Sequence, residues 1–468
     1  MDSPPYSLEQ VLKVACQHPF YNRDARYPPS RTTLHGLVKE LDTGSKGPDI
    51  GDFPVITKTE LSQVVSRLIG DNSPDNGYRH NCYATITGGG FKRGTPLLWL
   101  TDSVENRHHR AAGGKLVRAS GVIDPTDVVL NLHVSGHFYR SLDMTTDILE
   151  HAGATVLPAG SNMPSDTVVQ ALISYCITCL AGPVTELVRV AMHISRLSGC
   201  VCLRGQLNVR KLFYTSEPLS AVQEAFLKHI FGPVAIYSGL GSAEIGFWGV
   251  GNPRLTGPAG SVDAREYIYD TRNMLVEILP SDSDSSDIET APGAVPEGTT
   301  GHIVVTSLQR LRNPLVRYNG GDVGSVHPLP AAARHHLPPE EAEHYRVLRM
   351  YGRDPRLSFT WRSKAFDYEA VFAMLQRPGW NILQSQVVLD DDQQQTGERL
   401  EIRLMRGYGL DGEVPDEDVV SELRRFFSAG SDASFSVKFV SDVSALERSN
   451  TGQKVVRFVD KRKGCLGQ

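Results

Sequence analysis

The chain has 468 residues, of which 40% are hydrophobic and 22% are charged, and its formal net charge is -5. This length exceeds what one hydrophobic core usually supports, so we expect two domains, one of them small. The composition is typical of a globular enzyme and excludes a fibrous or largely disordered chain. The small negative charge provides no large basic field, so nucleic acid is not an expected partner.

The amino terminus reads MDSPPYSLEQ, which lacks the basic and apolar regions of a secretory signal. No stretch of about 18 apolar residues could span a bilayer. We therefore expect a soluble, cytoplasmic protein without membrane contact.

Between residues 115 and 250 short apolar runs alternate with helical patterns, which is typical of βαβ units around a mostly parallel sheet. The predicted strands are 127–132, ATVLPAG, ITCLAG at 177–182, the start of VRKLFYTSEPL, and PVAIYSGLG. The predicted helices are 141–151, a helix capped by Ser165, PVTELVRVAMHISRLS and LSAVQEAFLKHIFG. The fold class is therefore α/β, with a large multi-layer amino-terminal domain.

Beyond residue 255 the segments MLVEILP and GHIVVTSL predict strands, separated by the polar stretch SDSDSSDIETAPGAVPEGTT. After about residue 353 the pattern predicts a small α+β domain, with strands near 383–389 and 400–405 and a helix near 416–427. We place the boundary near Gly352, which gives domains of residues 1–352 and 353–468.

Seven cysteines are few for this length and fit reduced thiols better than a disulfide framework. The nearest pattern to a metal motif is formed by Cys176, Cys179, Cys200 and Cys202. Cys179 lies in an apolar predicted strand and no histidine has a ligand-like spacing, so burial of apolar thiols is favoured over structural zinc.

The segment TITGGGFKRGTP, residues 85–96, places four glycines and three threonines in twelve positions. Such a loop can present backbone N–H groups to phosphate oxygens, because glycine permits close approach. It does not have the P-loop spacing. Taken alone, a glycine-rich turn without a ligand is the simpler interpretation.

The order of motifs along the chain resembles the adenylate-forming superfamily, most closely its phenylacetate–CoA ligase branch. The motifs that carry this resemblance are HPFYNRDAR, FPVITKTEL, the glycine-rich loop, DVVLNLHVSGHFYRSLDM, HAGATVLPAG, LFYTSEPLS, GLGSAEIG, PLVRYNGGDVG, YGRDP and SNTGQKVVRFVDKRK. They cover nearly the full length. The resemblance implies ATP and Mg²⁺ as cofactors and a carboxylic acid, aromatic in the nearest relatives, as substrate. Relatives often form homodimers, which is a hint by analogy only.

The resemblance also implies roles for particular residues. The ATP phosphates would contact Thr85, Thr87, Gly88, Gly89, Gly90, Gly94 and Lys92. Ser216, Glu217 and Pro218 would line the adenine pocket, and Gly241, Ser242, Asp322 and Arg353 would also bind the nucleotide. Glu244 would hold Mg²⁺, and Lys454 would bridge the substrate carboxylate and the α-phosphate. The acid pocket would include His133, Ser135, His137, Phe138 and Gly239.

These roles fit the chemistry, because attack of a carboxylate on a phosphate brings two anions together and needs positioned positive charge rather than a general base. Each residue also has a plainer interpretation. Lys454 could belong to a solvated basic tail, Glu244 could begin a helix, and Asp322 after two glycines could form a turn. A lone histidine such as His133 is more often structural than a ligand.

Three departures from the family pattern concern the acceptor and the nucleotide. Leu240 stands where the family has a tyrosine that stacks on adenine, Pro355 interrupts the hinge, and Arg362 replaces a glycine along which the pantetheine arm passes. Three hypotheses follow: transfer of the acyl group to CoA, transfer to an amine, which Arg362 favours, or a relative that binds nucleotide without turnover. The retention of Lys454, Glu244, Asp322 and Arg353 favours an active adenylating enzyme.

Overall fold

The computed structural model describes fourteen segments of the chain, which together include most of both predicted domains. They are residues 6–42, 47–87, 97–197, 203–257, 264–280, 294–337, 339–353, 358–362, 364–391, 398–407, 409–410, 412–430, 433–449 and 452–462.

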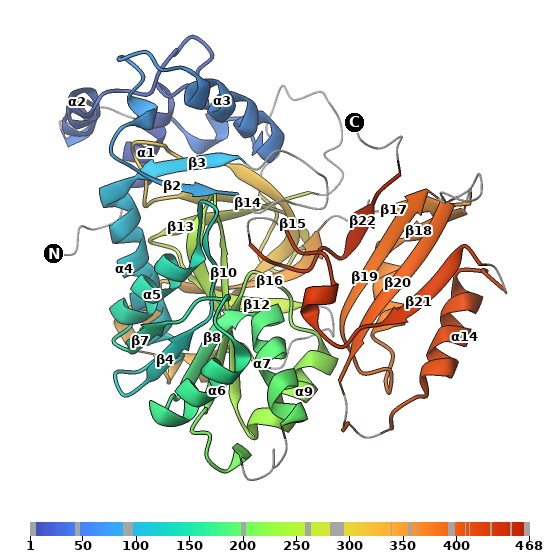
Figure 1. Ribbon diagram of the computed structural model, residues 1–468. Helices are drawn as coiled ribbons and strands as arrows, with labels where there is room; N and C mark the ends of the chain where they lie inside the picture. Colours follow the sequence, from blue (N-terminus) through green and yellow to red (C-terminus); the bar gives the residue numbers. More distant parts are fainter. Residues whose placement is uncertain are drawn as a thin grey trace.

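A 12-stranded sheet forms the centre of the larger part (Figure 1). Its parallel half consists of β10 (Ala235–Ser242), β9 (Lys211–Thr215), β8 (Cys179–Pro183), β4 (Val128–Asn131) and β7 (Thr155–Pro158), in that order. The helices around it are α4 (Ser103–Ala119), α5 (Ser141–His151), α6 (Ser165–Ser174), α7 (Val184–Arg196) and α9 (Ala221–Phe231). The predicted βαβ units are thus confirmed. Ser165 is the first residue of α6 and Pro164 occupies the cap, so the predicted capping role of Ser165 was wrong.

The other half of this sheet is antiparallel. Its strands are β11 (Gly246–Gly251), β12 (Arg265–Asp270), β16 (Tyr345–Arg353), β15 (Tyr318–Pro328), β14 (Gly301–Ser307) and β13 (Met274–Leu279), with β1 (Ile56–Thr57) added in parallel to β15. The segments MLVEILP and GHIVVTSL form the predicted strands, β13 and β14, and these pair with each other in an antiparallel orientation. The polar stretch between them falls largely in residues 281–293, outside the described residues.

The amino-terminal segment covers the antiparallel half with helices and a hairpin. These elements are α1 (Leu8–Ala15), α2 (Arg31–Asp42), α3 (Lys58–Gly70), β2 (Cys82–Ile86) and β3 (Leu98–Asp102). The buried face of α3 presents Leu61, Val65 and Leu68 to a cluster that contains Trp99 and Trp248. This packing fixes the start of α3 beside the sheet.

Shorter elements complete the larger part and lie mostly at strand ends. They are η1 (Ile50–Asp52), η2 (Gly77–Arg79), β5 (Ser135–Gly136), β6 (Tyr139–Arg140), α10 (Pro253–Thr256), α11 (Ala331–Arg334) and α12 (Pro339–Ala342).

The carboxy-terminal part is a smaller α+β unit, as predicted. Its sheet has the order β21 (Phe435–Phe439), β20 (Glu398–Arg406), β19 (Ile382–Asp391) and β22 (Phe458–Asp460), and it is accompanied by β17 (Ser358–Trp361), β18 (Lys364–Asp367), α13 (Tyr368–Leu375), α14 (Asp416–Phe426) and η3 (Val443–Ala445). It has its own aromatic-rich core. The boundary near Gly352 falls within β16 and stays a prediction.

An apolar patch of the carboxy-terminal part packs against α7 and α9. The patch, which we call the interdomain patch, consists of Leu383, Met405, Val443, Leu446 and Val455. Beside it the Gln223 side chain of α9 donates a hydrogen bond of 2.6 Å to the Leu383 carbonyl. In Figure 1 the last part of the chain, in red, runs between the two sheets.

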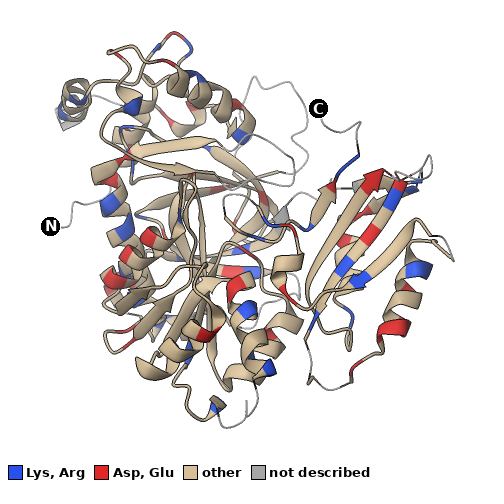
Figure 2. Ribbon diagram, in the orientation of Figure 1, with Lys and Arg blue, Asp and Glu red and all other residues tan. Residues whose placement is uncertain are grey.

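Charged residues of both signs are interspersed along the helices and strands of both parts (Figure 2). None of the helices in the described part of the chain combines the length and the apolarity that crossing a bilayer requires.

Candidate functional site

The carboxyl ends of β4, β8, β9 and β10 lie along one edge of the sheet, because these strands are parallel. In open α/β sheets this edge is where ligands bind. Many of the predicted site residues follow these strands: His133 after β4, Ser216, Glu217 and Pro218 after β9, and Gly239, Gly241 and Ser242 in β10. The fold thus brings segments together that are more than 80 residues apart in the chain.

Glu244 lies in the turn between β10 and β11, so the interpretation as the start of a helix was wrong. Its side chain is only 6% exposed. Within the turn the Ser242 hydroxyl accepts a hydrogen bond of 3.1 Å from the Ile245 amide. The guanidinium of Arg310 donates to the carbonyls of Glu244 and Ile245, the latter at 2.7 Å. Burial lowers the pKa of Arg310 to about 10, so this side chain stays charged at neutral pH.

His109 of α4 holds the other side of this turn. Its Nε2 lies 2.7 Å from the Phe247 carbonyl, and burial lowers its pKa to about 3. The ring is therefore neutral, with the proton on Nε2. Gly246 has a φ of +87°, and a Cβ there would lie 2.6 Å from His109 Cε1, so this position requires glycine.

Two further glycines allow neighbouring groups to pack closely against the end of β10. A Cβ at Gly239 would lie 2.6 Å from Phe247 Cε2, and one at Gly241 would lie 2.6 Å from the Gly246 carbonyl oxygen. Gly241 and Ser242 are exposed at the sheet edge. Leu240, at the position of the family's adenine-stacking tyrosine, is half-buried and packs against the cluster of Trp248.

The glycine-rich segment begins in β2, which pairs with β3 in an antiparallel hairpin. Thr85 lies in β2 opposite Trp99. Thr87 is buried and closes the hairpin through two hydrogen bonds with Leu97. The Thr87 amide donates to the Leu97 carbonyl at 2.9 Å, and the Thr87 hydroxyl accepts from the Leu97 amide at 3.0 Å. The predicted phosphate-binding residues Gly88, Gly89, Gly90, Lys92 and Gly94 lie outside the described residues.

Three of the predicted acid-pocket residues, Ser135, His137 and Phe138, form the exposed β5–β6 hairpin. His137 and Phe138 have φ values of 49° and 62°, so they form a two-residue turn that usually favours asparagine and glycine. Phe138 is 76% exposed, and its carbonyl accepts a hydrogen bond of 3.1 Å from the Ile86 amide. This hairpin therefore lies beside the end of β2.

His133 is fully buried and links the ends of two strands. Its Nδ1 lies 2.7 Å from Asn131 Oδ1 and its Nε2 lies 2.7 Å from Thr215 Oγ1. Burial lowers its pKa to about 3, and the nearby Lys454 ammonium adds to this effect. The neutral ring thus donates to Asn131 and accepts from Thr215. His133 positions the strand end that carries Ser216.

The segment after β9 turns sharply. Ser216 has a φ of 76°, and its carbonyl faces the carboxy-terminal part. The carboxylate of Glu217 accepts hydrogen bonds of 2.8 Å from both the amide and the hydroxyl of Thr185, in the first turn of α7. A carboxylate is favourable there because of the helix dipole. Glu217 therefore anchors α7, and the half-buried Pro218 follows it.

Lys454 comes from the carboxy-terminal part and reaches this edge. Its Nζ donates a hydrogen bond of 3.3 Å to the Ser216 carbonyl. Its loop is closed by two contacts with Ser449, which donates its amide to the Lys454 carbonyl at 2.7 Å and accepts from the Lys454 amide at 3.2 Å. The structure thus places the predicted lysine over the ends of the parallel strands.

Asp322 and Arg353 are direct neighbours across β15 and β16. The backbone register therefore brings the two predicted nucleotide-binding positions together. The side chain of Arg353 lies outside the described part of the structure.

The described residues contain no group of three or more histidine, cysteine, aspartate or glutamate side chains arranged to hold a metal ion. Cys179 is buried in β8, where burial raises the pKa of its thiol, and Cys176 is exposed. Cys200 and Cys202 lie outside the described residues. The Oε1 atom of Glu244 is shielded and accepts no hydrogen bond from the described residues. A hard carboxylate oxygen of this kind fits Mg²⁺ completed by phosphate and water oxygens.

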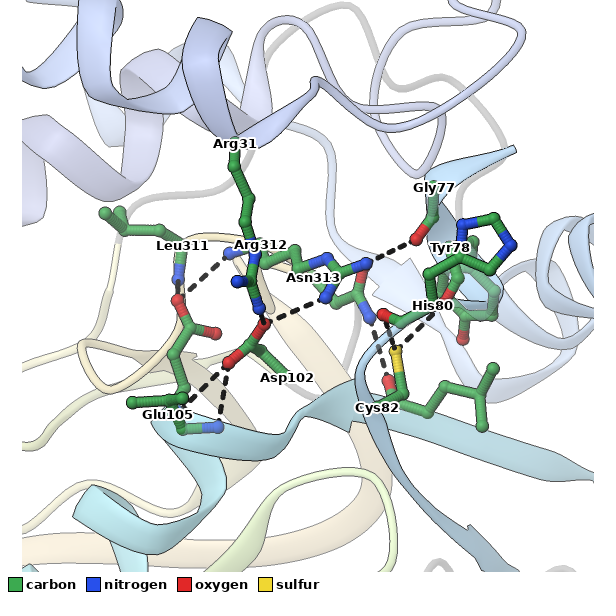
Figure 3. Close-up of polar contacts among 12 residues, drawn as sticks. Arg31, Gly77, Tyr78, His80, Cys82, Asp102, Glu105, Leu311, Arg312 and Asn313 are labelled. Carbon is green, nitrogen blue, oxygen red and sulfur yellow. Dashed lines mark hydrogen bonds and ion pairs between the residues drawn. The ribbon is translucent and has the colours of Figure 1, made fainter. Parts of the chain in front are cut away.

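A buried polar network fixes the loop that carries Arg310 (Figure 3). Asp102 accepts hydrogen bonds from Arg312 at 2.9 Å and from Arg31 at 3.1 Å. Glu105 accepts from the amides of Leu311 at 3.0 Å and Arg312 at 3.3 Å. Burial raises the pKa of Asp102, but the hydrogen bonds from Arg312 and the backbone outweigh it and lower the pKa overall. The loop is thereby tied to α4.

Sequence reasoning missed two residues that contact Glu244, namely Arg310 and Lys58. The ammonium of Lys58 forms an ion pair of 2.9 Å with Glu244 Oε1. Lys58 lies in the segment FPVITKTEL, which was one of the motifs that carry the family resemblance. The position of this motif in the family order was the signal that could have pointed to Lys58. Neither spacing nor periodicity connects it with a glutamate 186 positions later.

No protein-family model matches the chain, and no curated protein matches it. Solved structures do resemble it. A 2-hydroxyisobutyryl-CoA ligase in the postadenylation state with 2-HIB-AMP aligns with a TM-score of 0.64 at 18% identity, over 98% of this chain and 89% of that chain. In the thioesterification state with 2-HIB-AMP and CoA, that enzyme aligns with a TM-score of 0.54 at 18% identity, over 97% and 88%. The chain therefore has the fold of the adenylate-forming ligases.

Proposed function

We propose that this protein is an ATP-dependent ligase that activates a carboxylic acid as acyl-AMP and then transfers the acyl group to a thiol, that of CoA. The observation that carries the proposal is the position of Lys454, whose ammonium lies 3.3 Å from the Ser216 carbonyl. A mobile carboxy-terminal domain, beginning after residue 352, would bring this lysine to the site. The shared fold with a CoA ligase supports this assignment.

The proposed role of each residue in this reaction follows from the charge of its side chain. Lys454 would hold the acid carboxylate and the α-phosphate together, because the two anions repel each other without a cation between them. Asp322 and Arg353 would hold the nucleoside, and Thr85 and Thr87 would position the loop at the phosphates. Glu244 is the carboxylate that fits Mg²⁺, which when bound supplies positive charge to the phosphates.

An amine acceptor is the second candidate. Arg362 is exposed in the turn after β17, and its guanidinium carbon lies 5.2 Å from the centre of the Trp361 ring. In the family a glycine at this position lets the pantetheine arm pass close to the backbone, and an arginine side chain would narrow that path. This observation favours a small acceptor over CoA.

ATP–pyrophosphate exchange tests adenylation directly, across a panel of aryl, aliphatic and amino acids. We expect exchange that depends on one class of acid and that falls about 100-fold or more in Lys454→Ala, the range of single electrostatic contributions in active sites. Lys438→Ala is the matched control, because Lys438 lies in β21 of the same unit and pairs with Glu401 at 2.6 Å. Exchange that is equal in both variants would exclude the role of Lys454.

Adding CoA or amines to the acid found in this way identifies the acceptor. Formation of an acyl-CoA supports the main proposal, and formation of an amide supports the second candidate. If ATP binds but no acid supports exchange, the proposal of an active ligase is wrong and a nucleotide-binding relative remains.

A further inference from the structure

The Glu244 carboxylate has one half-exposed cation beside it. Lys58 Nζ lies 2.9 Å from Glu244 Oε1, and the two side chains are 48% and 6% exposed. The same oxygen is fully shielded and accepts no hydrogen bond from the described residues. The ammonium is therefore close enough for an ion pair but is not aligned as a hydrogen-bond donor. Lys58 is held to Glu244 mainly by charge.

The backbone of Lys58 is fixed, so only its side chain can move. β1 pairs in parallel with β15, with Ile56 opposite Tyr318 and Thr57 opposite Asn319. Thr57 caps α3, and its hydroxyl accepts from the Glu60 amide while Glu60 accepts from the Thr57 amide. Lys58 is the next residue and the first of the helix. Its half-exposed stem can swing without disturbing the strand or the cap.

The second cation near Glu244 cannot move in this way. Arg310 is 3% exposed, and its guanidinium is used by the carbonyls of Glu244 and Ile245. A buried carboxylate without a cation is costly. In the absence of a metal ion, Lys58 supplies the charge on the solvent side of Glu244.

We propose that Lys58 is a positioning residue that acts as the resident counter-ion of Glu244 and is displaced when a divalent cation binds there. This inference rests on the proposed role of Glu244 as the metal carboxylate. Lys58 and the metal ion would compete for the same oxygen, so each entry of the metal releases one lysine side chain. The ion pair would keep the site ready for a cation while weakening the binding of the metal alone.

Direct binding of Mn²⁺ to the full-length, nucleotide-free protein tests this competition, with free Mn²⁺ measured by electron paramagnetic resonance. We expect Lys58→Met to bind Mn²⁺ about tenfold more tightly than the wild type, because the competing charge is gone. Lys58→Arg keeps the charge and should bind at the wild-type level. The double variant Lys58→Met with Glu244→Gln should lose the gain.

Lys228→Met is the control, because the Lys228 side chain is 49% exposed, against 48% for Lys58, and pairs on α9 with a Glu224 carboxylate that is not buried. Its Mn²⁺ affinity should equal that of the wild type. If Lys58→Met fails to fold, Lys58→Gln removes the same charge and gives the same test. Unchanged or weaker Mn²⁺ binding in a folded, charge-free variant would overturn the inference.

The outcome is separable from that of the proposed function. Tighter Mn²⁺ binding in Lys58→Met without acid-dependent exchange in the wild type would support the counter-ion role and reject the ligase. Exchange in the wild type with unchanged Mn²⁺ binding in Lys58→Met would support the ligase and reject the counter-ion role.

Discussion

The two charged residues at the centre of the candidate site are held in different ways. Glu244 lies in a turn that Arg310, His109 and Ser242 fix from three sides. Lys454 lies in a loop closed by Ser449, and its Nζ makes a contact of 3.3 Å with a carbonyl of the other part of the molecule. One residue lies in a turn between two strands of the central sheet, and the other belongs to the carboxy-terminal part.

This difference in how the two residues are held indicates which of them contributes to the stability of the fold. Under the proposed function, Glu244 would meet a doubly charged cation and would benefit from a fixed geometry, because reorganisation during the reaction would cost free energy. Lys454 would act only in the adenylation step and would benefit from a contact that is easily broken. We therefore expect substitutions around Glu244 to lower stability and those around Lys454 to lower activity with little effect on stability.

The largest expected effect is on Arg310. Arg310→Met removes two charge-assisted hydrogen bonds and leaves two carbonyls without their donor, so the free energy of unfolding should fall by about 3 kcal/mol. Arg310→Lys should lose less, since an ammonium can still reach one carbonyl. Urea denaturation measures both. The exposed Arg334→Met is the control and should stay within about 0.5 kcal/mol of the wild type, and an equally small loss in Arg310→Met would contradict the comparison.

The second effect depends on pH and again concerns the fixed turn. The pKa of His109 is about 3 in the folded protein against 6.5 ordinarily, so between these values the unfolded chain binds a proton that the folded protein does not. Stability should therefore fall as the pH is lowered below about 6.5. His109→Gln keeps a donor for the Phe247 carbonyl and should remove up to about 1.4 kcal/mol per pH unit of this dependence.

Urea titrations at pH 8, 6 and 5 check this prediction. At pH 8 the variant and the wild type should have similar stability, and at pH 5 the variant should have lost less. Parallel pH dependences would show that the pKa of His109 is not lowered in the folded protein. The region after residue 352 contains none of the 15 histidines, so this kind of acid sensitivity belongs to the larger part of the chain.

The smallest effect is expected in the Lys454 loop. Ser449→Ala removes the hydroxyl that accepts from the Lys454 amide at 3.2 Å. We expect a loss of about 0.5–1 kcal/mol in transition-state stabilisation, seen as a two- to fivefold lower rate of exchange, with an unchanged melting temperature. A lower melting temperature with an unchanged rate would reverse the proposed contrast between the two residues.

Periodicity predicted the parallel half of the sheet well, because apolar runs such as ITCLAG are buried on both faces and leave a clear pattern. It also predicted α5 with its observed bounds. Tight turns were harder to predict from the sequence. His137 and Phe138 adopt positive φ values without glycine or asparagine, and no local signal marks them.

The membership of the candidate site stays a prediction, and the contacts of its residues were not predictable from the sequence. Glu217 was expected to line the adenine pocket, and it was not foreseeable from the segment LFYTSEPLS that its carboxylate would bind Thr185. Arg310 and Lys58 were missed because their contacts with Glu244 join residues far apart in sequence. Contacts of this kind depend on the tertiary fold and leave no periodic pattern.

The interdomain patch has a thermodynamic consequence. Separating the two parts would expose Leu383, Met405, Val443, Leu446 and Val455 to water. Exposure of apolar surface raises the heat capacity, and the attraction between such surfaces weakens on cooling. The balance between joined and separated arrangements should therefore shift with temperature along a curve, and cooling should favour the separated arrangement.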